Sequence, residues 1–93
     1  MKQAKTKTNE EFPRRRDIEN LGAIIGRNVR LARARRKITQ ENLVHAVHNQ
    51  GLSITVKTLV RLELGQTRTP NPEMIYNIAL ALNCSWKSLL KKE

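Results

Sequence analysis

Apolar residues recur at spacings of three and four over much of this chain, and that spacing places them on one face of a helix. The first such stripe predicts a helix that begins near Asp17, with Asp17 or Asn20 as its N-cap, and ends near Arg36. Gly22 and Gly26 lie inside this segment and weaken the prediction of one straight helix, because glycine is a poor helix former. The stripe consists of Ile18, Leu21, Ile25, Val29 and Ala32.

Four shorter helices are predicted after it, each preceded by a residue whose side chain can cap a helix N-terminus. These N-caps are Thr39, Thr55, Asn71 and Ser85. The second helix is expected to stop near Gly51 and the third at Gly65, since glycine readily takes the left-handed conformation that ends helices. Trp86, in the short fifth helix, is expected in the core. The inner faces consist of Leu43, Val44 and Val47, of Leu59 and Leu62, of Ile75, Ile78, Ala79 and Leu82, and of Leu89 and Leu90.

No segment alternates apolar and polar residues as a half-buried strand would. The sequence therefore predicts an all-α fold of five helices around one small core, over residues 17–93. Residues 1–16 are polar, contain Pro13 and lack the periodicity, so we expect a flexible, basic N-terminal arm there. Basic arms can reach along DNA, but an arm without a role fits the sequence equally well.

The chain is strongly basic, with 18 Lys and Arg against 8 Asp and Glu and a net charge of +10. This sign favours a polyanionic partner, nucleic acid first and an acidic membrane surface second. The alternative is a charge that only maintains solubility. No apolar run approaches the ~20 residues that span a bilayer, and no signal-peptide-like stretch begins the chain. Because Cys84 is the single cysteine, no internal disulfide can form, and a reducing cytoplasm is the expected location.

Residue sets typical of metal or catalytic sites are scarce. His45 and His48 share a helix face, but Cys84 is the one further soft ligand, so a solvated pair is preferred over a metal site. The chain has no glycine-rich phosphate loop and no nucleophile–base set with room for a pocket. We therefore expect no enzyme activity, no metal and no cofactor. The chain has one Trp, one Tyr and one Phe, so it offers few aromatic side chains on which the bases of a single-stranded nucleic acid could stack.

Several short strings stand in an informative order: Ile25–Arg30, Arg33, Ile38–Leu43, Thr55–Gly65, Pro70, Ala81–Ser85 and Leu89–Leu90. Together they resemble the phage repressor/Cro-type helix-turn-helix family, also called the XRE family, over roughly residues 24–90. The resemblance implies a repressor-like domain of five helices whose recognition helix, residues 56–64, lies in the major groove of double-stranded DNA. It also implies an ion pair between Arg33 and Glu63 that fixes the angle of this helix.

Five outward residues of the recognition helix are candidates for reading bases. Arg61 could donate two hydrogen bonds to guanine, Lys57 could reach guanine or a phosphate, and Thr58 could bond either kind of group. Val56 and Val60 could pack on thymine methyl groups, or their packing is incidental. The expected phosphate contacts are Thr39, Gln40, Thr55 and Arg68, with Arg27 or Arg30 as further candidates.

Two features depart from the family pattern. The connection between the second and third helices, Gln50–Ile54, is longer than the usual tight turn, and Leu52 and Ile54 are expected to enter the core and hold the third helix. Lys37 stands where a glycine usually ends the first helix, so this turn is expected to close differently or at some cost in stability.

The resemblance favours a transcriptional regulator from a bacterium or phage, most simply a repressor that binds operator DNA as a homodimer in the cytoplasm. Leu31 and Leu80 lie off the predicted inner faces and, with the last helix, are candidates for the dimer surface. One alternative is an antitoxin-like protein that binds a partner protein and regulates itself through the same domain. Another is a non-specific binder of nucleic acid or anionic surfaces.

Overall fold

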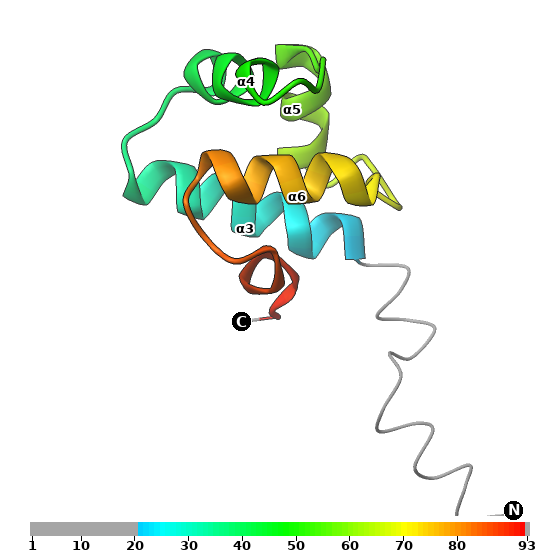
Figure 1. Ribbon diagram of the computed structural model, residues 1–93. Helices are drawn as coiled ribbons and strands as arrows, with labels where there is room; N and C mark the ends of the chain where they lie inside the picture. The colour runs from blue at the N-terminus through cyan, green and yellow to red at the C-terminus, as the bar shows by residue number, and fades with distance from the viewer. Residues whose placement is uncertain (1–20, 93) are drawn as a thin grey trace, which may run out of the picture.

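The computed structural model describes residues 21–92, and every regular element in that range is helical (Figure 1). The elements are α3 (Leu21–Arg35), α4 (Gln40–Asn49), α5 (Val56–Glu63), α6 (Pro72–Ala81) and the 3-10 helix η1 (Trp86–Leu90). The predicted all-α fold is thus confirmed, with a 3-10 helix as its fifth member. The expected N-terminal arm and the predicted caps Asp17 and Asn20 lie outside the described residues.

The N-caps predicted for the four shorter helices are confirmed, since each side chain accepts a hydrogen bond from a backbone N–H of the first turn. Thr39 Oγ1 accepts from the N–H of Asn42 at 3.0 Å, and Thr55 Oγ1 accepts from that of Thr58 at 3.1 Å. Asn71 and Ser85 do the same at the starts of α6 and η1. The boundaries of these helices therefore follow from local chemistry.

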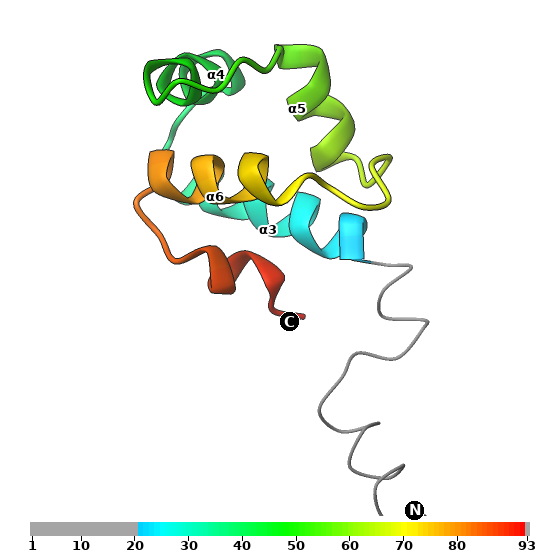
Figure 2. The same cartoon turned by 45° about the vertical axis from the view of Figure 1, so that its right-hand side comes forward.

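One core joins the helices. α3 packs against α5 and η1, while α6 packs against α4 and η1. In the two views, α4 and α5 lie on one side of α3 and η1 lies on the other (Figures 1 and 2). The largest fully buried side chains are Ile25, Leu43, Leu59, Leu62, Ile78, Leu82, Leu89, Val29 and Val47.

The assignment of Trp86 to the core was wrong, because 44% of this residue is exposed. η1 reaches the core through Leu89, which is fully buried. The indole instead lines an apolar pocket at the surface with Tyr76 and Pro72. The core is small and encloses the leucine side chain of η1. The larger indole stays partly outside, since tryptophan is rarely buried completely in any domain.

Gly22 and Gly26 do not interrupt α3, which is one continuous helix. A Cβ atom at Gly22 would lie 1.6 Å from the carbonyl O of Thr67, and one at Gly26 would lie 1.8 Å from that of Leu62. Both glycines are buried in this contact. They allow the backbone after α5, and the end of α5 itself, to approach α3 more closely than any side chain would permit.

The turn after α3 closes in the left-handed geometry that a glycine would favour, although the residue is Lys37, with a φ of 55°. The N–H of Lys37 donates to the carbonyl O of Ala34, and the N–H of Ile38 donates to that of Arg33, both at 3.1 Å. The turn therefore has the ordinary hydrogen bonds of a helix end. Of the two outcomes expected when lysine replaces the usual glycine, the structure shows the loss of stability, because Lys37 takes a left-handed conformation. Gly51 and Gly65 have positive φ values, as predicted.

Candidate nucleic-acid interface

The connection between α4 and α5 is anchored in spite of its length. Ile54 is buried in the core and Leu52 packs against the core, as the sequence predicts. His48, near the end of α4, donates its Nε2–H to the carbonyl O of Ile54 at 2.7 Å. These contacts hold the backbone just before α5, so the extra residues do not loosen the start of this helix.

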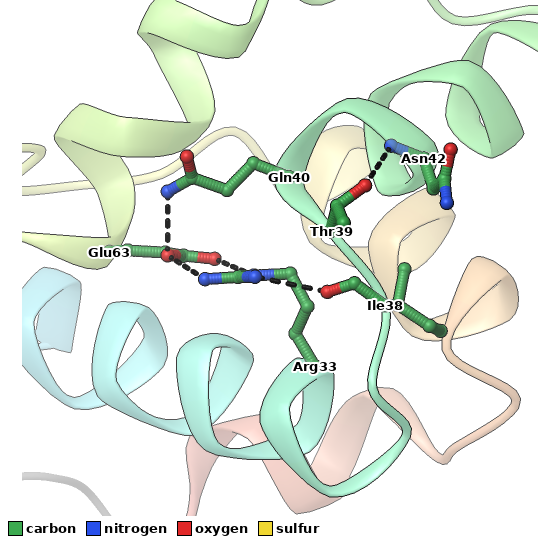
Figure 3. A network of polar contacts seen from close by, with 6 residues as sticks. All are labelled: Arg33, Ile38, Thr39, Gln40, Asn42 and Glu63. Carbon is green, nitrogen blue, oxygen red and sulfur yellow. Dashed lines mark hydrogen bonds and ion pairs between the residues drawn. The ribbon is translucent and has the colours of Figure 1, made fainter.

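The end of α5 is fixed by an ion pair that crosses to α3 (Figure 3). Arg33 Nε donates to Glu63 Oε2 at 2.8 Å, and Arg33 Nη2 donates to Glu63 Oε1 at 2.9 Å. The side chain of Glu63 is only 4% exposed and that of Arg33 is 19% exposed. Two parallel hydrogen bonds with little access to water set both the distance and the angle between α5 and α3.

Two further groups extend this pair into a network. Arg33 Nη1 donates to the carbonyl O of Ile38 at 3.0 Å, in the turn between α3 and α4. Gln40 Nε2, from the first residue of α4, donates to Glu63 Oε1 at 3.1 Å. The guanidinium and the carboxylate thus tie α3, the start of α4 and the end of α5 together, as Figure 3 shows. A contact of Gln40 with Glu63 was not foreseen, since nothing in the spacing of the two residues indicates it.

The environment of Arg33 strengthens its charged form. Its hydrogen bonds to Glu63 raise the pKa of the Arg33 guanidinium above the usual value, and the charges of Glu63 and Glu41 act in the same direction against partial burial. A raised pKa keeps the stabilising contribution of this cation intact at every pH below its usual pKa. The guanidinium therefore stays charged throughout the neutral range, and its side of the pair adds no pH dependence there.

The face of α5 that points away from this network is cationic. Lys57 and Arg61 are both exposed and, four residues apart, lie on the same face of the helix. Leu64 continues this row and is 66% exposed, the largest value among the bulky apolar residues of the described chain. The sequence analysis did not name Leu64, although the spacing of three from Arg61 could have placed it on this face.

The other three base-reading candidates are less accessible. Val56 is partly buried against the core, and Val60 is half-buried. The Thr58 hydroxyl lies 3.0 Å from the Thr55 hydroxyl, so it already has a partner within the helix cap. Lys57 and Arg61 are therefore the two predicted base readers whose functional groups extend freely from the helix.

The expected phosphate-contacting residues occupy two kinds of position. Thr39 and Thr55 are exposed caps, each next to the N–H groups of a helix N-terminus, where an anion is favoured. Arg68 is exposed in the segment between α5 and α6. Gln40 is half-buried, and its amide nitrogen donates one hydrogen bond to Glu63, so the second amide N–H and the amide oxygen make no contact in this network.

Other kinds of site find little support among residues 21–92. No three His, Cys, Asp or Glu side chains of this part of the chain come together as metal ligands would. None of its helices combines the length and the apolar character that a membrane crossing needs.

Comparison with protein families identifies the arrangement. A family model described as helix-turn-helix, HTH_3, matches residues 29–89, which include α4, α5 and both partners of the ion pair. No curated protein and no solved structure matched the chain. The matched family is a DNA-binding one and not a catalytic one. The chain belongs to the XRE/Cro/C1-type helix-turn-helix family and carries its DNA-binding domain.

Proposed function

We propose that the protein is a transcriptional regulator, acting as a repressor, that recognises a specific operator in double-stranded DNA by placing α5 in the major groove. The observation that carries this proposal is the combination of two faces on one short helix. One face holds the buried Glu63 in the network with Arg33, and the other presents Lys57 and Arg61 to solvent. A recognition helix needs both a fixed angle and protruding donors, because base edges are read by hydrogen bonds of defined direction.

Within this proposal the residues divide by task. Arg61 and Lys57 donate to base edges, with Arg61 suited to the O6 and N7 atoms of guanine. Leu64 packs on a thymine methyl group at the end of the same row. Thr39, Thr55 and Arg68 donate to the sugar–phosphate backbone, as does the second amide N–H of Gln40, and these contacts position the domain without reading sequence.

The protein acts as a homodimer in this proposal, because one such domain offers a small interface for tight specific binding. Of the two leucines considered from the sequence, Leu80 is 51% exposed on α6, next to the equally exposed Tyr76 one turn earlier. Leu31 instead lies in a hollow between α3 and η1. The α6 face is thus the better candidate for the contact between copies, and half-sites about 34 Å apart are expected.

The test is a selection of bound duplexes from a random pool, followed by affinity measurements on the selected site. Arg61→Ala is expected to cost about 1–3 kcal/mol on this site and to relax the preference at one base position. Arg35→Ala removes another exposed arginine, from α3, and is the matched control, with an expected loss that is small and equal for all sequences. A pool that yields no enriched sequence, or equal effects of both variants on every duplex, would refute specific recognition by α5.

A further inference from the structure

An apolar pocket lies where the start of α3, the beginning of α6 and η1 meet. The first turns of α3 and α6 are at the same end of the molecule in both views (Figures 1 and 2). The pocket has a volume of about 360 Å³, and we call it the Trp86 pocket. Its lining, which includes Leu21, Pro72, Tyr76, Trp86 and Leu90, contains no charged side chain.

Two aromatic rings form the open part of the Trp86 pocket. Trp86 is 44% exposed and Tyr76 is 52% exposed, whereas Pro70 and Ile75 are buried beneath them. Exposed apolar surface of this kind is stabilised when another apolar group covers it, and aromatic rings pack well on one another. A phosphate or another anion would find no charged partner among the lining residues. The pocket therefore favours an apolar, and best an aromatic, side chain.

The chain itself supplies such a side chain next to the pocket. Leu21 lines the pocket and is the first residue that the structure describes, so residues 1–20 join the domain at the pocket edge. Phe12 is the single phenylalanine of the chain. It precedes Leu21 by nine positions, and an extended chain covers about 30 Å over that length, which is enough to turn back. A short tether also gives an effective concentration on the order of millimolar, which favours this occupant over a separate partner.

The charges before Phe12 match the charge beside the indole. Glu10–Glu11 directly precede Phe12. Lys87 Nζ lies over the ring of Trp86, 5.9 Å from its centroid. With the phenyl ring against the indole, these carboxylates would lie near the ammonium group. Such exposed pairs add little stability, but they favour one direction of the segment across the pocket.

The charges after Phe12 match the other side of the pocket. Arg14–Arg16 follow Pro13. Glu73 stands next to Pro72, a lining residue, in the first turn of α6. A segment that runs from η1 toward α6 thus meets a charge of opposite sign on each side of its aromatic ring.

We infer that Glu10–Pro13 fold back on their own domain and that Phe12 fills the Trp86 pocket. Pro13 suits this path, because the residue before a proline prefers an extended conformation to a helical one. No residue of α5 lines the pocket, so its occupation leaves Lys57 and Arg61 free. The inference concerns the fate of the N-terminal segment and does not depend on the proposed function.

The first test uses the full chain with 4-fluorophenylalanine in place of Phe12, which gives a single ¹⁹F resonance. We expect this resonance to lie away from its position in the urea-unfolded protein and to show a nuclear Overhauser effect to the indole protons of Trp86. Tyr76→Ala should move it toward the unfolded position. Leu80→Ala removes an equally exposed side chain of α6 that does not line the pocket, and should leave it unchanged.

The second test uses Trp86, the single tryptophan of the chain, as a fluorescent reporter. Phe12→Ser should raise the quenching of Trp86 by acrylamide about twofold, because the indole loses its cover. Gln3→Ser, a change near the start of the same segment, should leave the quenching as it is. Circular dichroism checks that each variant is folded.

Four results would overturn the inference. These are a ¹⁹F resonance at the unfolded position, equal effects of Tyr76→Ala and Leu80→Ala, unchanged quenching in Phe12→Ser, and a resonance that shifts with protein concentration. The last would assign the pocket to a second copy of the chain. None of these measurements involves DNA, so their failure leaves the proposed DNA recognition to its own test.

Discussion

Removal of the Glu63 carboxylate should destabilise the domain more than any change on its surface. This carboxylate accepts two hydrogen bonds from Arg33 and one from Gln40, and its side chain is 4% exposed. In Glu63→Ala the guanidinium of Arg33 would keep only its bond to the carbonyl O of Ile38. Loss of one partner of a buried pair costs about 3–5 kcal/mol.

The lower end of that range applies here, because Arg33 is 19% exposed and water can replace part of what it loses. We therefore expect Glu63→Ala to lower the free energy of unfolding by about 3 kcal/mol. For a domain of this size that corresponds to a fall in Tm on the order of 15 °C. The stability of Glu63→Gln should lie between that of the original protein and that of Glu63→Ala. The amide keeps one acceptor oxygen, but it turns N–H donors toward the guanidinium of Arg33.

Urea and thermal unfolding followed by circular dichroism would measure these changes. Glu73→Gln is the matched control, because Glu73 is an exposed carboxylate in the first turn of α6, where its loss should cost less than about 1 kcal/mol. The double variant Arg33→Met/Glu63→Leu should recover most of the loss, since apolar residues of similar volume often replace a buried pair without penalty.

The same variants separate stability from function. Glu63→Gln should weaken binding to the selected operator at temperatures where it is folded, because the angle of α5 is less fixed. The salt dependence of binding should stay unchanged, since no contact with phosphate is lost. A Glu63→Ala protein that unfolds within about 0.5 kcal/mol of the original would refute the assignment of this network as the main constraint on α5.

Three further changes test individual features of the fold by urea unfolding. Lys37→Gly should stabilise by about 0.5–1 kcal/mol, because glycine relieves the positive φ but gains freedom in the unfolded chain; a loss of stability would contradict this. Gly26→Ala should destabilise by about 3 kcal/mol or more, since its Cβ would meet the carbonyl O of Leu62, and a neutral result would show that α3 and α5 can separate freely. Thr55→Ala should cost about 1 kcal/mol by removing the cap of α5, while Thr55→Ser should be nearly neutral, so equal losses would argue against capping.

The helix starts could be predicted from the sequence because N-capping involves residues that are close together in the chain. The hydroxyl of Thr39 and the N–H of Asn42 are three residues apart, so their hydrogen bond depends on nothing distant in the sequence. The start of α6 could be predicted for a similar local reason, because Pro72 directly follows the cap and proline favours the first position of a helix. The left-handed stops at Gly51 and Gly65 belong to this class as well, since they express a preference of one residue type.

Features that depend on two distant segments could not be derived in this way. Gly22 and Gly26 read as weak points in a helix, and their role emerges only when the carbonyl groups of Thr67 and Leu62 are seen against them. The contact of Gln40 with Glu63 spans 23 positions and has no periodic signature. The pairing of Arg33 with Glu63 entered through a family resemblance, and chain spacing alone would not have selected it.

Net charge gives an incomplete description of how this protein meets its partners. The value of +10 indicates a polyanion, but the cations of the described chain fall into groups that face different directions. Arg33 forms an internal ion pair with Glu63. Lys57 and Arg61 extend from α5, whereas Arg27 and Arg35 lie on the far side of α3. If DNA were the single target, charges on the far side would add attraction without contact, and their effect would fade over a Debye length of roughly 8–10 Å in ordinary salt. Substitution of Arg27 or Arg35 should therefore weaken binding to every duplex by a similar small amount that depends on salt, whereas substitution of Lys57 or Arg61 should change which sequence is preferred.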